Sequence, residues 1–140
     1  MKSKRGKVYL VGAGPGDPGL LTLRGAECLS TADVVFYDYL AAPELLSHSR
    51  RGAELICLGR HGHGRLMSQT EICAAIVRHA LSGRTVVRLK GGDPAIFARL
   101  AEELDALEAA NISYEIVPGV TAASAASSHA GVRWRGCSMR

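Results

Sequence analysis

The sequence is poor in aromatic side chains, and it lacks long apolar runs. Aromatic residues make up 5% of the 140 residues, which is little stacking surface for a protein that reads single-stranded nucleic acid. No apolar run reaches the roughly 18–20 residues of a membrane span. The basic N-terminus runs into glycines rather than into a signal-peptide core. We therefore predict a soluble, cytoplasmic protein that binds neither nucleic acid nor a membrane.

The sequence also lacks the residue spacings of a metal site. No Cys-x-x-Cys pair occurs among the four scattered cysteines, Cys28, Cys57, Cys73 and Cys137. Structural zinc and a disulfide framework are therefore not expected. His61 and His63 share a glycine-rich loop, but no cysteine or carboxylate stands near them, so they are weak ligands. We predict that the protein holds no metal.

The composition fits a basic, single-domain globular protein. Apolar residues make up 47% of the chain, and its length is enough for one domain with a real core. Lysine and arginine total 17 against 13 acidic residues, which gives a formal net charge of +4. The arginines gather in "SRRG", "GRHGHGR" and "RWRGCSMR". This distribution suits an anionic ligand, such as a polycarboxylate or a phosphate.

Short apolar strands alternate with amphipathic segments of helix length along the chain. Strands are predicted at residues 7–12, 33–37, 54–58, 85–89 and 113–117. Helices are predicted at residues 22–31, 43–49, 68–82, 95–110 and 120–129. Ser68 and Glu71 have the spacing of a capping box at the start of the third helix. The alternation predicts an α/β fold with a five-stranded, mostly parallel sheet flanked by helices.

Every predicted strand ends in glycines or a carboxylate. "GAGPGDPG" follows the first strand, Asp38 the second, "GRHGHGR" the third, "GGDP" the fourth and "PGVTA" the fifth. In open parallel sheets, ligands bind at the carboxyl ends of the strands. Glycine there permits positive φ and lets a ligand approach the backbone. The sequence therefore predicts a ligand site along this one edge of the sheet.

The first glycine loop is also a candidate dinucleotide site. Gly12-x-Gly14 fits the start of the G-x-G-x-x-G fingerprint, and Asp38 falls near the place of a ribose-binding acid. The third glycine is missing, however, Pro15 has no N–H to offer a phosphate, and the carboxylate of Asp17 would repel one. A tight turn without any ligand is the plain structural alternative.

The two carboxylates at strand ends have structural interpretations as well. Asp93 stands before Pro94, where it is well placed to cap a helix. Asp38 ends an apolar strand, where it can accept N–H groups of a turn. The functional interpretation makes Asp38 a proton acceptor or a ligand anchor. The two glycines before Asp93 are more than a cap requires, and they let a bulky ligand lie against the main chain.

Three stretches in this order carry a resemblance to a known family. They are "VYLVGAGPGDPGLLTLRGAECLSTADVVFYD", "RLKGGDP" and "VPGVTAA". Together these stretches are far more specific than any one glycine motif. Residues 7–132 resemble the tetrapyrrole methylases, and within that family they are most similar to the uroporphyrinogen-III C-methyltransferases. The resemblance implies a two-domain α/β fold, a homodimer and S-adenosylmethionine as methyl donor. It also implies uroporphyrinogen III, a tetrapyrrole polycarboxylate, as the substrate that is converted to precorrin-2 for siroheme or cobalamin.

The resemblance further implies roles for individual residues. Asp38 matches the proton acceptor of the family. The residues that match its contacts to S-adenosylmethionine are Pro15, Gly91, Gly92, Asp93, Ile96, Thr121 and Ala122. Arg60 stands where the family has a lysine assigned as proton donor. An arginine, with a pKa above about 12, is a poor donor; either Arg60 binds a substrate carboxylate, or proton donation is less essential.

The chain departs from the family in two further ways. "GGDPAIFARLAEE" replaces "GGDPFIFGRGGEE", and the alanines and leucine predict a helix in place of a loop. The family has a second domain, whereas here we expect one domain at residues 1–132 and a tail at 133–140, with the second domain missing. Because the second domain of the family closes the cleft over the cofactor, we expect the chain alone to exclude water poorly and to have little or no methylase activity. The alternative is a non-catalytic cofactor-binding or assembly module with the same fold.

Overall fold

The computed structural model describes residues 4–59, 66–96 and 98–131, and these form a single parallel sheet with helices on both faces. The strands are β1 (Lys7–Gly12), β2 (Val34–Tyr37), β3 (Glu54–Cys57), β4 (Val86–Lys90) and β5 (Ser113–Val117). They lie in the order β3-β2-β4-β1-β5, and every neighbouring pair is parallel. The predicted fold class is confirmed, and the carboxyl ends of all five strands lie at one edge.

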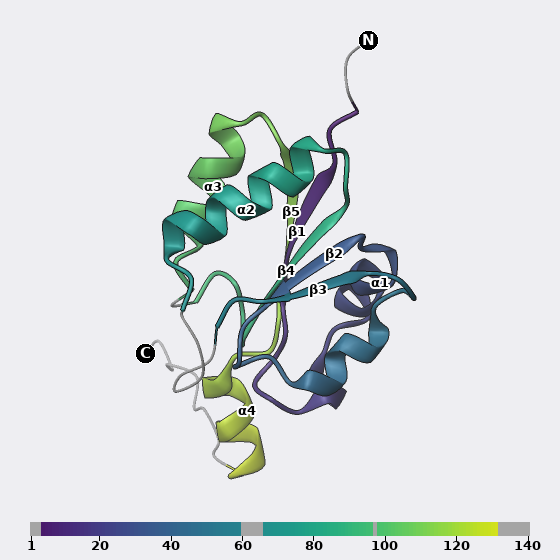
Figure 1. Ribbon diagram of the computed structural model, residues 1–140. Helices are drawn as coiled ribbons and strands as arrows, with labels where there is room; N and C mark the ends of the chain where they lie inside the picture. Colours follow the sequence, from purple (N-terminus) through teal and green to yellow (C-terminus); the bar gives the residue numbers. More distant parts are fainter. Residues whose placement is uncertain (1–3, 60–65, 97, 132–140) are drawn as a thin grey trace.

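The path of the chain explains why helices cover both faces. The chain runs from β1 outward to β2 and β3, and then back across the sheet to β4 and β5. Because crossovers between parallel strands are right-handed, the outward and return connections lie on opposite faces. The first face therefore carries α1 (Leu23–Thr31) and the 3₁₀ helix η2 (Pro43–His48), and the second carries α2 (Gln69–Leu81) and α3 (Leu100–Ala109) (Figure 1).

Each face of the sheet has its own apolar core, since side chains alternate along a strand. Val86 of β4 packs with Ile76 and Leu107 beneath α2 and α3. Val87 and Leu89 of the same strand pack in the core beneath α1 and η2. All five residues of β4 are buried, and full burial of an apolar side chain such as Val87 or Leu89 is worth about 1.5–3 kcal/mol. This central strand fixes the position of the "GGDP" loop that follows it.

Local capping explains where two of the helices begin. The Thr22 hydroxyl accepts a hydrogen bond from the backbone N–H of Gly25, 3.0 Å away, at the start of α1. At α2 the Ser68 hydroxyl accepts from Glu71 N, and the Glu71 carboxylate accepts from Ser68 N. The capping box predicted from the sequence is therefore confirmed.

The prediction of a helix over residues 95–110 is wrong in its first part. A turn follows Asp93, where Ile96 N donates to the Asp93 carbonyl oxygen at 3.1 Å. The α3 helix begins only at Leu100, and the residue before it, Arg99, has a left-handed φ of 48° that ends any helix running into it. The alanines of this segment favour a helix, but the local turn prevails over their propensity.

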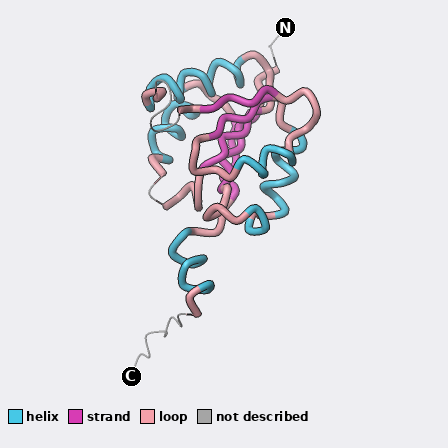
Figure 2. The backbone as a smooth tube through the Cα atoms, turned by 60° about the horizontal axis from the view of Figure 1, so that its bottom comes forward, coloured by secondary structure: helices cyan, strands magenta, loops and turns pink. Residues whose placement is uncertain are grey.

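The last helix, α4 (Ala122–His129), stands out from the body of the sheet at its carboxyl edge (Figure 2). Thr121 caps it by accepting from Ser124 N at 3.3 Å. Ala125 is the one buried residue of this helix. In the described ranges, no helix has the length and apolar character that a membrane crossing requires.

Candidate functional site

Two glycine loops are joined at the carboxyl edge of the sheet. Gly92 N donates to Gly14 O at 2.8 Å, and Gly14 N donates back to Gly92 O at 3.2 Å. Both residues have positive φ, 79° at Gly14 and 66° at Gly92, a conformation that favours glycine. The loops after β1 and β4 therefore form one continuous main-chain surface.

The loop after β5 packs against these two loops at a distance that only glycine allows. A Cβ on Gly119 would lie 2.3 Å from Gly92 O and 2.8 Å from the Cα of Gly12. A Cβ on Gly12 would in turn lie 2.6 Å from the Cα of Gly119. The absence of side chains thus lets three strand ends meet, and this explains the glycines that recur in the sequence.

Asp93 links the loops after β4 and β5 with its carboxylate. Its Oδ1 accepts from Ala95 N at 2.8 Å, and its Oδ2 accepts from Gly119 N at 3.2 Å. The prediction that Asp93 caps a helix is therefore wrong: it closes a turn and ties down a loop 26 residues further along the chain. Two backbone bonds orient the carboxylate at the edge of the sheet.

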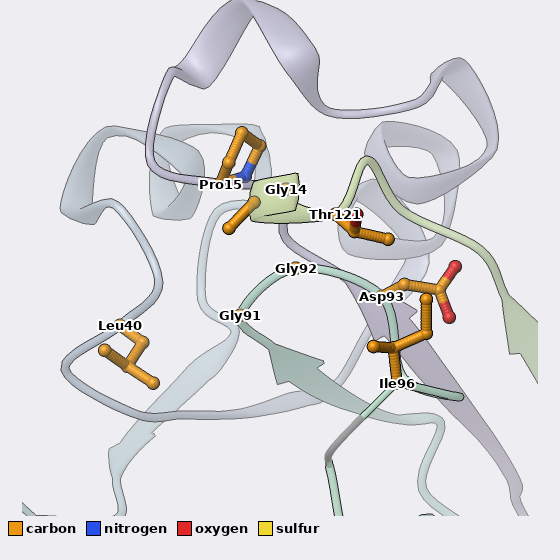
Figure 3. A pocket seen from close by; sticks show the side chains of 9 residues that line it. Gly14, Pro15, Leu40, Gly91, Gly92, Asp93, Ile96 and Thr121 are labelled. Carbon is orange, nitrogen blue, oxygen red and sulfur yellow. The ribbon is translucent and has the colours of Figure 1, made fainter. Parts of the chain in front are cut away.

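A cavity of about 290 Å³ opens where these loops meet (Figure 3). The residues that line it are Gly14, Pro15, Leu40, Gly91, Gly92, Asp93, Ile96, Thr121 and Ala122. The set contains all seven residues that the sequence assigned to the cofactor. Leu40 and Ile96 stand on opposite sides of the loop at Gly91 and Gly92. Gly14 and Leu40 were missed, although Gly14 belongs to the same glycine loop and Leu40 follows Asp38 closely in "YDYL".

Asp38 lies outside that cavity and lines two neighbouring ones. The second cavity, of about 220 Å³, is lined by Asp38, Leu40, Gln69, Arg88, Lys90, Gly91, Ile96, Ala98 and Arg99. It shares Leu40, Gly91 and Ile96 with the first cavity. A third cavity, of about 380 Å³, lies on another side of Asp38 and includes Tyr37 and Cys57. The predicted proton acceptor therefore lines a cavity next to the predicted cofactor site, and Leu40, Gly91 and Ile96 line both cavities.

The carboxylate of Asp38 is held by its own loop and by a buried arginine. Its Oδ1 accepts from Leu40 N at 3.0 Å, as the structural interpretation of the sequence proposed. Its Oδ2 lies 3.5 Å from a terminal nitrogen of Arg88. The side chain of Asp38 is 23% exposed and that of Arg88 is 7% exposed. Asp38 therefore faces a cavity while a buried cation stands behind it.

The floor of the second cavity contains a buried ion cluster that the sequence analysis missed. Glu103 accepts from Arg88 Nε at 3.2 Å and from Lys90 Nζ at 2.6 Å. Burial lowers the pKa of Lys90, and the charge of Glu103 opposes that shift. A signal for the cluster was available: two cations two residues apart in a buried central strand share one face and need a counter-ion.

Some predicted features lie outside the described residues. Arg60, the candidate substrate-binding or proton-donating residue, is one of them, and so are His61 and His63. The predicted domain boundary at Val132 and the tail at 133–140 lie outside as well. Within the ranges 4–59, 66–96 and 98–131, no group of three or more His, Cys, Asp or Glu side chains is arranged to hold a metal ion.

Comparison with known proteins adds independent findings. The family model for tetrapyrrole (corrin/porphyrin) methylases matches residues 7–137. The chain is 54% identical over 131 residues to the siroheme synthase of Baumannia cicadellinicola, covering 94% of this chain and 28% of that protein. It is 52% identical over 132 residues to the uroporphyrinogen-III C-methyltransferase of Bacillus subtilis, covering 94% of this chain and 27% of that protein.

Two solved structures of uroporphyrin-III C-methyltransferase from Thermus thermophilus share the fold. One has a TM-score of 0.82 at 41% identity, covering 96% of this chain and 56% of that one. The other, a complex with S-adenosyl homocysteine, has a TM-score of 0.76 at 41% identity and covers 96% of this chain and 57% of that one. The chain thus spans from about a quarter to a little over half the length of these relatives.

Proposed function

Because the chain belongs to the tetrapyrrole (corrin/porphyrin) methylase family, we propose that it is the cofactor-binding domain of an S-adenosylmethionine-dependent uroporphyrinogen-III C-methyltransferase. The observation that carries this proposal is the first cavity, which gathers all seven of the predicted cofactor contacts from three loops. The uroporphyrin-III methyltransferase of Thermus thermophilus, a relative with the same fold, has been solved with S-adenosyl homocysteine. The product in this proposal is precorrin-2.

The residues of the first cavity fit S-adenosylmethionine in size and chemistry. Its volume of about 290 Å³ is near the lower end for small-molecule pockets, roughly 300–1,000 Å³. Gly91 and Gly92 have no side chains, so a ligand can contact their main-chain groups directly. Asp93 accepts two backbone bonds, but a carboxylate has about four acceptor sites, so it retains capacity for a hydroxyl or ammonium group. Leu40 and Ile96 supply apolar contact.

The second cavity suits the acceptor side of the reaction. When bound, S-adenosylmethionine supplies a methyl group on a sulfonium centre that leaves as a neutral thioether. A ring carbon of the tetrapyrrole forms the new bond to this methyl group, and the ring must then lose a proton. In this proposal Asp38 accepts that proton, and its position in the lining of the cavity next to the first one supports this role. Leu40, Gly91 and Ile96 form the shared wall, and they orient the two reactants toward each other.

The substrate class, the assembly and the location of the protein are further parts of this proposal. We propose that a tetrapyrrole polycarboxylate is the substrate, since the net charge of +4 and the clustered arginines suit such an anion. We also propose that the enzyme acts as a homodimer in the cytoplasm. Sedimentation equilibrium of the purified protein tests the oligomeric state, and a monomer at micromolar concentration contradicts this part of the proposal.

A non-catalytic cofactor-binding module is the second candidate, and Arg60 favours it. Arg60 replaces a lysine that the resemblance assigns as proton donor, and an arginine donates protons poorly. A module of this kind binds S-adenosyl homocysteine but does not transfer the methyl group.

One experiment separates these candidates from each other and from a dinucleotide-binding fold. Calorimetric titrations with S-adenosyl homocysteine and with NAD are combined with an anaerobic assay for methylation of uroporphyrinogen III by the full-length protein that contains this domain, because the domain alone is expected to have little or no activity. Binding of S-adenosyl homocysteine together with methyl transfer supports the enzyme. Binding without transfer supports the module, and binding of NAD alone supports the dinucleotide fold. If neither ligand binds at millimolar concentration, the cofactor proposal is wrong.

A further inference from the structure

Three buried charged side chains form a cluster at the second cavity, which two of them, Arg88 and Lys90, line. Arg88 and Lys90 come from β4 and Glu103 comes from α3, and their side chains are 7%, 5% and 1% exposed. Each oxygen of Glu103 is engaged: Oε1 accepts from Arg88 Nε at 3.2 Å, and Oε2 accepts from Lys90 Nζ at 2.6 Å. One carboxylate therefore bridges two buried cations.

Packing alone does not account for this cluster. The cost of removing charges from water offsets most of their attraction, so apolar side chains of similar volume commonly serve a core equally well. Arg88 and Lys90 also stand two residues apart on the same face of β4, where like charges repel each other. The position of the cluster, at a cavity that Asp38 lines, points to a role in that cavity.

The hydrogen bonds of Arg88 fix the direction of its guanidinium group. Nε donates to Glu103, and Nη1 donates to Leu89 O at 2.9 Å. With the group held at these two points, Nη1 lies 3.5 Å from Oδ2 of Asp38. The other oxygen of Asp38 accepts from Leu40 N. Asp38 is thus held between its own turn and a cation that is anchored to α3.

We propose that Glu103 is a positioning residue, which fixes the Arg88 guanidinium and through it holds the Asp38 carboxylate toward the second cavity. The inference rests on the proposed function, in which Asp38 accepts a proton from the tetrapyrrole. Glu103 does not touch the cavity itself, since it is absent from the described lining residues. The same carboxylate holds Lys90, the residue before Gly91, and so ties the start of α3 to the loop between the two cavities.

The first test compares Glu103→Gln with Asp105→Asn. Asp105 lies on the same helix but is exposed, and no ion pair of its carboxylate is found within the described ranges. In the full-length protein that contains this domain, we expect Glu103→Gln to lower kcat at least tenfold while the affinity for S-adenosyl homocysteine changes less than threefold. Asp105→Asn should change neither. Unchanged kcat in folded Glu103→Gln contradicts the inference, and so does an equal loss of kcat and cofactor affinity, which indicates general disruption.

A second variant covers the case in which Glu103→Gln does not fold. Arg88→Lys keeps a buried cation for Glu103 but removes the planar fork that reaches both carboxylates. The same split is expected, with reduced kcat and nearly unchanged affinity for S-adenosyl homocysteine. Wild-type kcat in Arg88→Lys overturns the inference.

The second test does not depend on catalysis. Chemical denaturation measures how much Asp38→Asn lowers the free energy of unfolding, once in the wild-type background and once in Glu103→Gln. Substitutions at independent sites have additive effects on this free energy, and substitutions at coupled sites do not. Without Glu103, the two buried cations depend on Asp38 as their remaining nearby counter-ion. We therefore expect Asp38→Asn to reduce the folding equilibrium constant at least threefold more in Glu103→Gln than in the wild type. Equal effects in the two backgrounds overturn the inference.

The two tests separate the inference from the function on which it rests. Coupling between Asp38 and Glu103 without any methyl transfer refutes the proposed function but retains the positioning contact. Methyl transfer with unchanged kcat in Glu103→Gln and no coupling retains the function and refutes the role of Glu103.

Discussion

The two cavities on either side of Gly91 differ in what the chain contributes to them. Among the described residues that line the first cavity, Asp93 is the only charged one, and four others are glycine or alanine. The second cavity has charged side chains from Asp38, Arg88, Lys90 and Arg99. The first site therefore depends on the absence of side chains where loops meet, and the second depends on charged side chains, two of which, Arg88 and Lys90, belong to β4. Both cavities lie at the same edge of the sheet because β4 supplies residues to each: Arg88 and Lys90 line the second cavity, and Gly91, which follows β4, lines both.

The largest effect should come from adding a side-chain atom where the glycine loops pack against each other. In Gly119→Ala the new Cβ would lie 2.3 Å from Gly92 O, and a backbone atom cannot yield as a side chain does. We expect a loss of about 3 kcal/mol or more in the free energy of unfolding, measured by chemical denaturation. Gly19→Ala is the control, because its Cβ would meet only the exposed carboxylate of Asp17 at 3.2 Å. Equal stability of the two variants would contradict the close approach of the loops.

The next effect tests the single charge of the first cavity. Asp93→Asn replaces a carboxylate oxygen that accepts from Gly119 N, so the loop after β5 loses an anchor. We expect affinity for S-adenosyl homocysteine to fall about tenfold, which corresponds to about 1.4 kcal/mol, as measured by calorimetry. Asp17→Asn is the matched control: Asp17 makes the same short turn bond, to Gly19 N at 2.8 Å, but lies outside the cavity. Similar losses in both variants contradict a specific role for Asp93.

The shared wall between the cavities should show a moderate effect. Leu40 is 60% exposed and lines both cavities. In the full-length protein that contains this domain, we expect Leu40→Ala to lower kcat several-fold while the free energy of unfolding changes little, because an exposed leucine contributes little to the core. Leu23→Ala is the control, since Leu23 is 91% exposed and is absent from the described linings of the cavities. An equal change of kcat in the two variants would contradict a role for Leu40 in the site.

The smallest effect concerns the ion cluster of Glu115, whose members are absent from the described linings of the cavities. Hydrogen bonds from Arg24 and, to a smaller extent, from Lys7 hold the pKa of Glu115 at about 2, below its usual 4.5. A lowered pKa contributes stability above pH 4.5 that is lost as the pH falls toward 2. The stability difference between wild type and Glu115→Gln should therefore shrink over this range in thermal unfolding, and it should be small because the pairs are exposed. A difference that grows as the pH falls contradicts this assignment.

The sequence predicted the main-chain part of the site better than the side-chain part. Glycines such as Gly92 and Gly119 can be identified individually in the sequence. Their position directly after predicted strands is a local pattern, so the sequence alone indicates where the main chain is free of side chains. The contact between Asp93 and Gly119, and the ion cluster of Glu103, join residues 26 and 13–15 positions apart. No local period encodes such pairs. The helix expected from residue 95 failed for the same reason, since the turn at Asp93 is tied to a distant loop.

The fold itself was predictable because each element carries a local signal. The capping box at Ser68 and Glu71 marked the start of α2, and the apolar run before Gly91 marked β4. The order of the strands is different in kind. It depends on which strands pack side by side, and crossover handedness then assigns the helices to faces.

The most direct test of the central claim, that the glycine-lined cavity binds S-adenosylmethionine, compares two alanine substitutions with the same backbone strain. Gly92 has a φ of 66° and Gly131 has a φ of 68°, and a Cβ on either residue would meet no atom of the described residues within 4 Å. Gly92 lines the cavity, whereas Gly131 follows α4 and is not among the described residues that line it. In calorimetric titrations with S-adenosyl homocysteine, Gly92→Ala should lower affinity at least tenfold and Gly131→Ala should leave it unchanged. Equal affinities in the two variants, or no binding to the wild type at millimolar concentration, would contradict the account.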